Sequence, residues 1–388
     1  MARIPGFTST GSKRPEALFG AAAGRTGVPS RMVRSYGCRV VDESGREYVD
    51  YVMGLGAVAL GYGHPGVTRA VQAAAADGAV GPLPPVLEEE VAETLCHLVP
   101  AMEQVRFLKT GAEAMAAAVR LARAHTGRDL VLGCGYHGWL DWCQPTGAPG
   151  VPPAVSGLYA ELPFNDAERT RTMIRAAGDR LAAVIAEPVI MAPPSRDWLA
   201  VLRDESHRAG AVLVLDEVKT VGRVAVGGAA ERWGIDADLV VVGKAIANGF
   251  PLAAVGGSRA VMAAASRAWI SSTLATEFVS LAAARATLDL LVRERVPEHL
   301  ERVGSRLLEG LARLADRYPE RVPGVAGLPS MCMLRFADDD VSSAVAAGCA
   351  ARGVLFKRAA YDFVSLAHDE TVVDQTLDIL DDVLSALR

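Results

Sequence analysis

The chain has 388 residues, of which 51% are hydrophobic and 22% are charged, and its formal net charge is −5. This length suits one large domain with an appended smaller one, or two ordinary domains, and the composition is that of a globular protein, which excludes a disordered chain or a fibre. The mild acidity without a basic cluster argues against a nucleic-acid partner, and no apolar run approaches the roughly 20 residues that would span a bilayer.

The N-terminus has no apolar signal segment, so we expect a cytoplasmic protein. The cysteines are scattered and show no metal-binding spacing, which favours free thiols and predicts no metal site. They are Cys38, Cys96, Cys134, Cys143, Cys332 and Cys349.

Three changes of pattern divide the chain. Residues 1–30 are rich in Gly, Pro, Ser and Ala and are expected to form an N-terminal arm. Residues 31–60 contain alternating apolar residues around an Asp-Glu-Ser-Gly turn signal, which predicts a β-hairpin. We expect this segment to join residues 286–388, with their long amphipathic helices, in a small α+β domain, while residues 61–285 form a large α/β domain.

Helical patterns alternate with short apolar runs in the large domain. One such helix is expected between Ser195, as its N-cap, and Gly210, just past its end. Strand, helix, strand at this spacing indicates a mostly parallel sheet covered by helices on both faces. The expected strands are 104–109, 129–134, 181–189, 211–217, 238–244 and 252–257.

Two of these expected strands end in a charge. The run before Asp216 and the run before Lys244 are both apolar enough to be buried on both faces. Ligands of open parallel sheets bind beyond the carboxyl ends of the strands, so both side chains are candidates for a site. The alternatives at this point are that the two simply pair with each other, or that each lies in solvent just past its strand.

A small-residue turn, Thr110 to Ala112, stands between another expected strand and a helix with an apolar face. The first N–H groups of a helix are unpaired and lie at its positive end, so this turn is a candidate phosphate site. By itself it can equally be an ordinary turn.

Several motifs together resemble one family. "VRFLKTGAEA", "GYHGW", "DEVKTVGRVAVGG", "DADLVVVGKAIANGFPLAAVGG" and "VSLAHDE" occur in the order found in class III pyridoxal-phosphate aminotransferases, and they are most similar to those of the glutamate-1-semialdehyde aminomutases. The resemblance extends from about residue 30 to near the C-terminus. It implies the α/β fold type I of pyridoxal-phosphate enzymes, a transferase activity and pyridoxal 5'-phosphate as the cofactor.

The resemblance also assigns roles to the strand-end residues. It makes Lys244 the residue that forms a Schiff base with the cofactor aldehyde and then moves a proton at the substrate carbon. It makes Asp216 the carboxylate that holds a proton on the pyridine nitrogen. Val218 would pack on one ring face and Tyr136 on the other.

Further cofactor contacts follow from the same resemblance. Gly111 and Ala112 would bind the phosphate through their backbone N–H groups. His137 and Glu187 would lie near the cofactor. Thr273 would reach the phosphate of a partner subunit, which implies a homodimer with shared active sites.

Lys219 is the competitor of Lys244 for the Schiff base. It stands where many relatives have Gln, and strand alternation would point it away from Asp216 and Val218. We therefore expect Lys219 to have a supporting or surface role.

Other departures from the aminomutase pattern indicate a changed substrate pocket. Leu55 stands where that family has a Trp, the segment 140–162 is compressed, and no Glu precedes "SLAH" in register. Arg34 and Arg358 are candidates, by position, for binding a substrate carboxylate.

The function that we expect is transfer of an amino group from a donor, such as glutamate, to a keto or aldehyde acceptor, in specialised biosynthesis. The first alternative is an isomerase on the same fold, either an aminomutase or an epimerase. The second is a catalytically silent scaffold, which retention of Lys244, Asp216 and the phosphate turn makes improbable.

Overall fold

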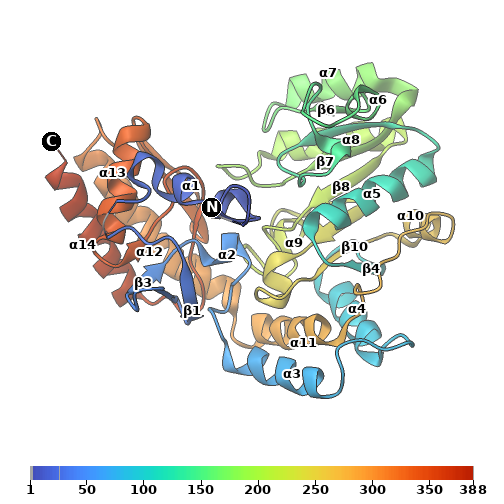
Figure 1. The fold of residues 1–388 in the computed structure, drawn as a ribbon. Coiled ribbons are helices and arrows are strands. Elements are labelled where there is room, and N and C mark those ends of the chain that lie inside the picture. Colours follow the sequence, from blue (N-terminus) through green and yellow to red (C-terminus); the bar gives the residue numbers. More distant parts are fainter. Residues whose placement is uncertain (1–2, 26, 388) are drawn as a thin grey trace. The chain divides into compact units, whose positions relative to one another are not determined.

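The computed structural model describes residues 3–25 and 27–387, and its elements are labelled in Figure 1. The chain divides into two compact units, one formed by Met1–His64 together with Glu298–Arg388 and the other by Pro65–Pro297. Within the described residues, no helix is long and apolar enough to cross a membrane.

The second unit, Pro65–Pro297, is built on a seven-stranded sheet in the order β4-β10-β9-β8-β7-β5-β6. Its strands are β4 (Gln104–Leu108), β5 (Leu130–Cys134), β6 (Tyr159–Glu161), β7 (Leu181–Ala186), β8 (Val212–Asp216), β9 (Leu239–Val242) and β10 (Ala253–Gly257). The six strands expected from the sequence are confirmed, and the short strand β6 at the edge of the sheet is an addition.

Neighbouring strands from β6 to β9 pair in parallel, as the sequence predicts. β10 is the exception, since it pairs antiparallel with both β9 and β4. Because β10 reverses direction between them, β4 runs the same way as β9, and the carboxyl ends of β4, β5, β7, β8 and β9 share one edge.

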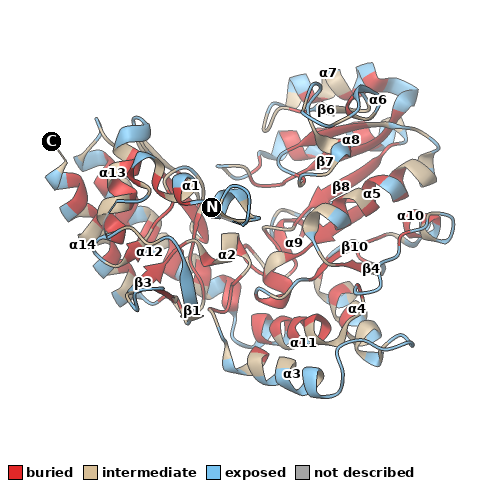
Figure 2. Cartoon of the chain, in the orientation of Figure 1, coloured by how far each residue is buried: buried red, intermediate tan, exposed pale blue. Residues whose placement is uncertain are grey.

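The strands in the middle of the sheet are covered on both faces, as Figure 2 shows by their red colour. Every residue of β7, β8, β9 and β10 is buried. Each Val or Leu side chain removed from water in this way contributes about 1.5–3 kcal/mol, which is why these continuous apolar runs form strands.

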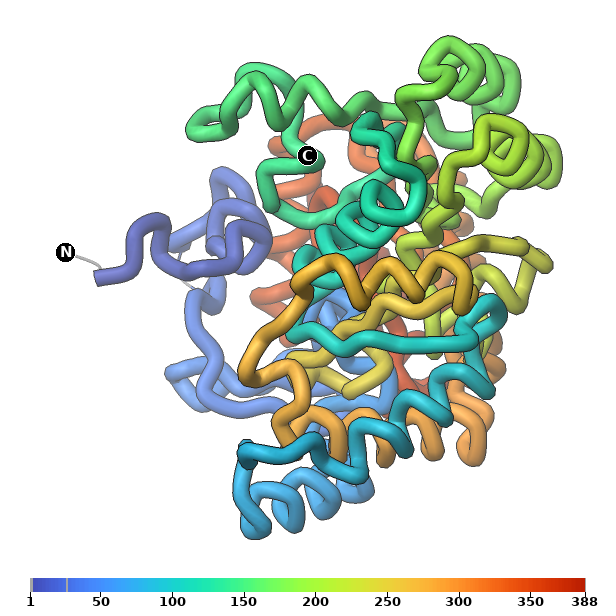
Figure 3. The backbone as a smooth tube through the Cα atoms, turned by 90° about the vertical axis from the view of Figure 1, so that its right-hand side faces the viewer, coloured from blue at the N-terminus to red at the C-terminus, as the bar shows by residue number. Residues whose placement is uncertain are grey.

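Helix α5 packs on one face of this sheet. Its small residues, among them Ala114, Ala118 and Ala122, belong to one buried cluster with Val214 of β8 and Val241 of β9. The segment of α10 and the 3₁₀ helix η6 lies beside α5, as the gold tube in Figure 3 shows. The helices of this unit are α3 (Pro65–Ala76), α4 (Val86–Leu98), α5 (Gly111–Thr126), α6 (Pro153–Ser156), α7 (Ala167–Ala177), α8 (Arg196–Ala209), α9 (Gly228–Trp233), α10 (Arg259–Met262) and α11 (Phe278–Arg293), and η6 is Ala263–Ser266.

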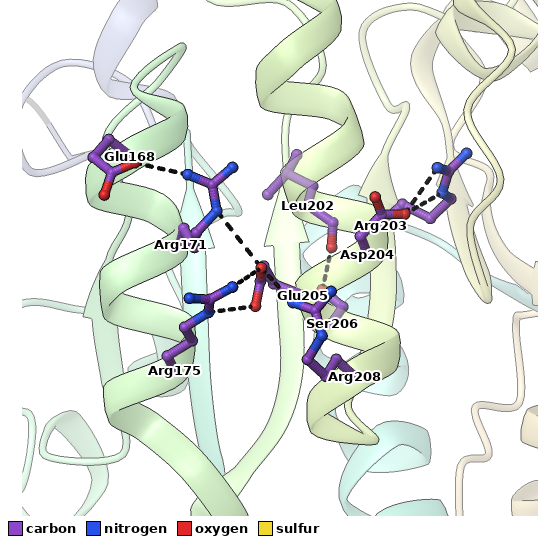
Figure 4. Close-up of polar contacts among 9 residues, drawn as sticks. All are labelled: Glu168, Arg171, Arg175, Leu202, Arg203, Asp204, Glu205, Ser206 and Arg208. Atoms are coloured by element: carbon purple, nitrogen blue, oxygen red, sulfur yellow. Dashed lines mark hydrogen bonds and ion pairs between the residues drawn. The ribbon is translucent and has the colours of Figure 1, made fainter.

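Helices α7 and α8 pack against each other and against β7. The side chain of Ser195 caps α8 by accepting from the Trp198 N–H, and Gly210 follows its end in a left-handed conformation, as the sequence predicts. Between the helices, Glu205 accepts two hydrogen bonds from Arg175, at 2.8 and 2.9 Å (Figure 4). Hydrogen bonds from Arg175 and then Arg208 lower the pKa of Glu205 to about 2.

The other unit contains a four-stranded sheet, β1-β2-β3-β13, and a three-stranded sheet, β11-β12-β14. The hairpin expected near residues 42–45 is formed by β2 and β3. β13 pairs with β3 in parallel, so this sheet combines strands from the N-terminal and the C-terminal parts of the chain. Within the segment expected to form an N-terminal arm, Pro15–Phe19 forms a short helix that starts with proline, which suits a first helical turn. The strands are β1 (Met32–Tyr36), β2 (Arg39–Asp42), β3 (Glu47–Asp50), β11 (Gly324–Leu328), β12 (Met331–Arg335), β13 (Val354–Leu355) and β14 (Asp362–Phe363), and the helices are α1 (Pro15–Phe19), α2 (Met53–Gly56), most of α12 (Val296–Arg317), α13 (Asp339–Ala350) and α14 (Glu370–Ala386).

Candidate active site

The candidate site lies at the carboxyl edge of the seven-stranded sheet. Asp216 is the last residue of β8 and pairs with Val241 of β9, and Lys244 follows β9 by two residues. On the other side of β8, Glu187 follows β7 directly. The parallel register therefore brings these strand-end residues to one edge, as the sequence predicts.

Lys244 has an unusual backbone conformation. Gly243 is extended, and Lys244 then adopts φ 47°, in the left-handed region, at the start of the 3₁₀ helix Lys244–Ala247. A residue other than glycine is strained there by about 1–3 kcal/mol, and backbone strain of this kind clusters at active sites.

The surroundings of the Lys244 amine favour its uncharged form. Its side chain lies among largely buried neighbours, and desolvation is the main cause that lowers the pKa of its amine. Lys219 lowers the pKa further, while Asp216 and Glu187 oppose the shift. A lowered pKa increases the fraction of the amine that is uncharged at neutral pH, and only this form can act as a nucleophile or accept a proton.

Asp216 is held by His137. The Asp216 Oδ2 atom lies 2.8 Å from Nδ1 of His137, and both residues are buried. The remaining ring nitrogen of His137, Nε2, has no hydrogen-bond partner among the described residues. His137 packs in turn on the ring of Trp142, with the ring centroids 6.2 Å apart. His137 therefore orients the carboxylate, which is a more specific role than the proximity to the cofactor that the sequence predicted.

Val218 lies between the strand end and the phosphate turn. Its N–H donates to Oδ1 of Asp216 at 3.2 Å. A Cβ atom added to Gly111 would meet Val218 Cγ1 at 3.1 Å, and one added to Gly243 would meet the same atom at 3.4 Å. Gly111 thus permits the turn to approach Val218, so the Val218 side chain lies between the phosphate turn and the end of β9.

The N-terminus of α5 offers backbone donors. Thr110 and Glu113 form a capping box, in which the Thr110 side chain accepts from the Glu113 N–H and the Glu113 side chain accepts from the Thr110 N–H. This arrangement does not use the N–H groups of Gly111 and Ala112, the two that the sequence assigns to phosphate.

Gly138 lies against this helix end. A Cβ atom on Gly138 would fall 2.5 Å from the Cβ of Ala112, so only glycine fits at this approach. The motif "GYHGW" contains Gly138, but no local signal in the sequence singles it out, because only the fold shows which residue it faces.

Glu187 connects three parts of the site. Its Oε1 accepts from the Tyr136 N–H at 3.0 Å, and its Oε2 accepts from the Lys219 ammonium at 2.5 Å. The Tyr136 side chain is 73% exposed, so Tyr136 contacts Glu187 through its backbone and leaves its ring accessible.

The position of Lys219 corrects one expectation. The strand ends at Asp216, and a turn begins at Glu217, whose carbonyl accepts from the Thr220 N–H at 3.1 Å. Strand alternation therefore does not reach Lys219, and its side chain lies in a largely shielded ion pair with Glu187 instead of on the surface.

Thr273 lies in an exposed segment of the same unit. That segment is fixed by two arginines, since Arg106 donates to the Ile270 carbonyl at 2.8 Å and Arg120 donates to the Trp269 carbonyl at 2.7 Å. The Trp269 side chain is 82% exposed. A fixed, exposed and partly apolar segment is suited to contact with another subunit.

The two arginines proposed for a substrate carboxylate belong to the other unit. Arg358 donates to Asp339 and to the Ser342 hydroxyl, so part of its guanidinium is used within that unit. Arg34 lies 4.0 Å from Glu47 in an exposed pair.

The donor set at the sheet edge fits pyridoxal 5'-phosphate. A carbonyl of this cofactor needs a reactive amine, its ring nitrogen needs a carboxylate, and its phosphate needs N–H donors. Lys244, Asp216 and the start of α5 provide the three kinds of group. The glycines at positions 111 and 138 leave room at the helix end where side chains would otherwise meet Val218 and Ala112.

Comparison with known proteins decides the family. A model of the family "Aminotransferase class-III" matches residues 21–387. The chain belongs to the class-III aminotransferases. The resemblance seen in the sequence is thereby confirmed, and with it a pyridoxal-phosphate-dependent enzyme of fold type I.

Individual relatives agree with the family over most of the chain. A glutamate-1-semialdehyde 2,1-aminomutase of Desulfitobacterium hafniense is 35% identical over 422 aligned positions, covering 100% of this chain and 97% of its own. The FumI protein of Sphingopyxis sp. MTA144, solved in its pyridoxal-phosphate internal aldimine form, has a TM-score of 0.88 at 30% identity and covers 92% of this chain and 89% of its own. A transaminase with bound pyridoxal phosphate has a TM-score of 0.89 at 26% identity, covering 99% and 94%.

Proposed function

We propose that this class-III enzyme is an aminotransferase that takes an amino group from an amino acid such as glutamate and delivers it to a keto or aldehyde acceptor in specialised biosynthesis. The observation that carries the proposal is the convergence of Lys244, with its lowered pKa, and the His137-bound Asp216 at one sheet edge. The departures from the aminomutase pattern at Leu55 and over 140–162 support a substrate other than that of the aminomutases.

Each residue has a defined task in this proposal. When bound, pyridoxal phosphate supplies an aldehyde that exchanges amines and a ring that withdraws electrons from the substrate carbon. The uncharged Lys244 amine would hold the cofactor through its aldehyde carbon, and the free amine would take and return a proton at the substrate carbon. Asp216, oriented by His137, would accept a hydrogen bond from the protonated ring nitrogen and so keep the proton on it.

The remaining residues position the cofactor. Gly111 and Ala112 donate their N–H groups to the phosphate, and Val218 packs on one face of the ring. The exposed Tyr136 ring covers the other face. Glu187 lies beside the ring and fixes Lys219.

We also propose that the enzyme is a homodimer in which Thr273 of the partner subunit completes the phosphate site. The exposed segment around Trp269 supports this assembly. A cytoplasmic location fits the free cysteines, since disulfides are rare in that reducing compartment.

Subunit complementation tests the shared site. Lys244→Ala and Thr273→Ala subunits are each expected to have low activity as homodimers. Mixed dimers contain one site with both residues intact, so mixing should restore part of the activity. If the mixture stays as inactive as its components while heterodimers form, Thr273 does not act across the interface.

An isomerase on the same fold is the second candidate. The named relatives at 35% identity are aminomutases, which rearrange one substrate without a separate acceptor, and their similarity favours this candidate. An aminotransferase consumes an external donor and, until an acceptor is added, leaves the cofactor in its amine form. An epimerase does neither. A screen of donors and acceptors, followed through cofactor absorbance, separates these activities.

The covalent attachment of the cofactor tests the site itself. Borohydride reduction of the holoenzyme should fix the cofactor on the peptide that contains Lys244, and Lys244→Ala should remove the label and the turnover while the fold remains. A label on Lys219 would contradict the assignment of Lys244. Protein that binds no cofactor would instead favour the scaffold.

A further inference from the structure

The exposed loop that contains Thr273, residues 269–277, has a defined backbone conformation. In this Thr273 loop the Ser272 carbonyl accepts a hydrogen bond from the Ala275 N–H at 3.1 Å, which closes a turn around Thr273. Ala275 is buried, whereas Thr273 itself is exposed. The turn is therefore packed against the protein on one side and exposes Thr273 on the other.

The start of the Thr273 loop is bound to the two elements that flank the phosphate turn. Arg106 of β4 donates to the Ile270 carbonyl at 2.8 Å, and Arg120 of α5 donates to the Trp269 carbonyl at 2.7 Å. These two contacts connect the loop to the strand before the phosphate turn and to the helix after it.

The end of the loop is bound by an ion pair next to the phosphate turn. The Nζ atom of Lys109, which follows β4 directly, lies 2.7 Å from Oε1 of Glu277, and the two side chains are only 16% and 14% exposed. The Lys109 N–H also donates to Glu113 Oε2 at 3.2 Å. Lys109 therefore joins the capping box of α5, through its backbone, to the Thr273 loop, through its side chain.

Glu277 is fixed from the other side as well, because it caps α11. Its Oε1 accepts from the Ser280 N–H at 2.9 Å, and its Oε2 accepts from the Val279 N–H at 2.7 Å. Burial by itself would raise the pKa of Glu277, but hydrogen bonds from Lys109 and Ser280 outweigh burial and lower this pKa. A shielded pair whose carboxylate has several donors defines geometry better than an exposed pair, which solvent screens.

The contacts connect two groups that are proposed to bind phosphate in different subunits. The turn Thr110 to Ala112 would bind the phosphate of its own subunit, while Thr273 would reach the phosphate in the partner subunit. Three side-chain contacts fix the Thr273 loop to β4, Lys109 and α5. A group that is already held in its binding conformation binds more tightly, because less conformational freedom is lost on binding.

We propose that Lys109 is a positioning residue that, through its ion pair with Glu277, holds the Thr273 loop in the conformation that binds the cofactor phosphate of the partner subunit. The inference rests on the proposed role of Thr273. It gives Lys109 an effect on the site of the other subunit, although Lys109 lies directly before the phosphate turn of its own. An ion pair that only supports its own phosphate turn would act on its own site, and one that only stabilises the fold would act on both sites alike.

Heterodimers with a single Lys244 separate these effects. One subunit, called the reporter subunit, retains Lys244 and so contains the site that is measured. The other subunit carries Lys244→Ala and contributes its Thr273 loop to that site. Two different affinity tags isolate the heterodimer. Borohydride fixation on the Lys244 peptide at increasing concentrations of pyridoxal phosphate then measures the cofactor affinity of the reporter site alone.

Lys109→Met is placed in one subunit at a time. In the subunit with Lys244→Ala, it should weaken cofactor binding at the reporter site about two- to tenfold, as expected when a loop must be ordered on binding. In the reporter subunit, it should leave the cofactor affinity near that of the unmodified heterodimer. Glu277→Gln removes the charge of the other partner in the ion pair and should give the same pattern, also where Lys109→Met does not fold.

Three further variants are placed in the subunit that contributes the loop. Lys109→Arg retains the charge and should retain most of the cofactor affinity of the reporter site. Arg285→Met breaks another ion pair of α11, with Glu90 at 2.6 Å, and should leave that affinity unchanged. Thr273→Ala should weaken cofactor binding about tenfold, since a hydrogen bond to a charged group commonly contributes this much.

The inference is overturned if Thr273→Ala weakens the reporter site across the interface while Lys109→Met and Glu277→Gln do not. It is also overturned if Lys109→Met acts only within the reporter subunit, acts equally from either subunit, or causes no more loss than Arg285→Met. Failure of the proposed function gives a different result. Thr273→Ala would then have no effect across the interface, or the unmodified reporter subunit would attach no cofactor at Lys244.

Discussion

Gly138→Ala tests the close approach between the "GYHGW" loop and the start of α5. Gly138 has φ +104°, and a Cβ atom there would lie 2.5 Å from the Cβ and 2.9 Å from the Cα of Ala112. The strained backbone costs about 1–3 kcal/mol, and relieving the overlap by moving the loop or the helix costs about another 1–3 kcal/mol. The displaced atoms include the proposed phosphate donor, the Ala112 N–H.

We expect the substitution to weaken cofactor binding more than it weakens the fold. The cofactor-free protein can relieve part of the strain by moving the loop, and cofactor binding must then restore the strained arrangement. If about 2 kcal/mol is relieved in this way, the affinity for pyridoxal phosphate falls about 30-fold. The assay is titration of cofactor-free protein with pyridoxal phosphate, followed by absorbance, with thermal unfolding measured in parallel.

Gly127→Ala is the matched control at the other end of α5. Gly127 has φ +70° and nothing within 4 Å of an added Cβ, so this variant has the backbone strain without the overlap. It should lower the melting temperature slightly and bind cofactor like wild type. The double variant Gly138→Ala, Ala112→Gly removes the Ala112 Cβ, with which the new side chain overlaps, and should recover part of the affinity for pyridoxal phosphate. Wild-type affinity in Gly138→Ala, or an equal loss in Gly127→Ala, would refute the reasoning.

Three further predictions concern carboxylates. Asp216→Asn should reduce turnover about 100-fold or more, because a neutral amide cannot stabilise a protonated ring nitrogen, and wild-type single-turnover rates would contradict this role. Glu205→Gln should lower the free energy of unfolding by about 2 kcal/mol at pH 7 in urea, a value kept modest because its arginine partners are partly exposed. The pKa of Glu205 is lowered to about 2 in the folded protein, so the stabilisation by Glu205 is present above pH 4.5 and disappears as the pH falls towards 2. The unfolding free energies of variant and wild type should therefore converge near pH 2, and a difference that stays constant with pH would contradict this prediction. Burial raises the pKa of Glu217 to about 7, so wild type should lose stability relative to Glu217→Gln as the pH rises from 4.5 through 7, and denaturation at pH 5 and pH 8 checks this sign.

The parts of the fold that the sequence predicts are those in which one physical signal dominates. The β8 and β9 runs are apolar throughout because they are buried on both faces, and α8 is delimited by the Ser195 cap and by Gly210. β6 escaped prediction because its three residues lie at the sheet edge and are not buried, so no apolar run marks them. The antiparallel direction of β10 has no local signal either, since a strand buried on both faces has the same composition in either direction.

The candidate site shows the same division. The positions of Asp216 and Lys244 follow from the rule that parallel strands end at one edge, but the hydrogen bond between His137 and Asp216 joins residues 79 positions apart and required the fold. Lys219 shows why a local rule fails at such an edge. Alternation holds only while the strand continues, and the turn that begins at Glu217 ends it, so a lysine expected on the far side instead pairs with Glu187. Strand ends are where backbone regularity stops and where ligands of open parallel sheets bind, so a rule based on strand alternation fails first at the residues that surround this candidate site.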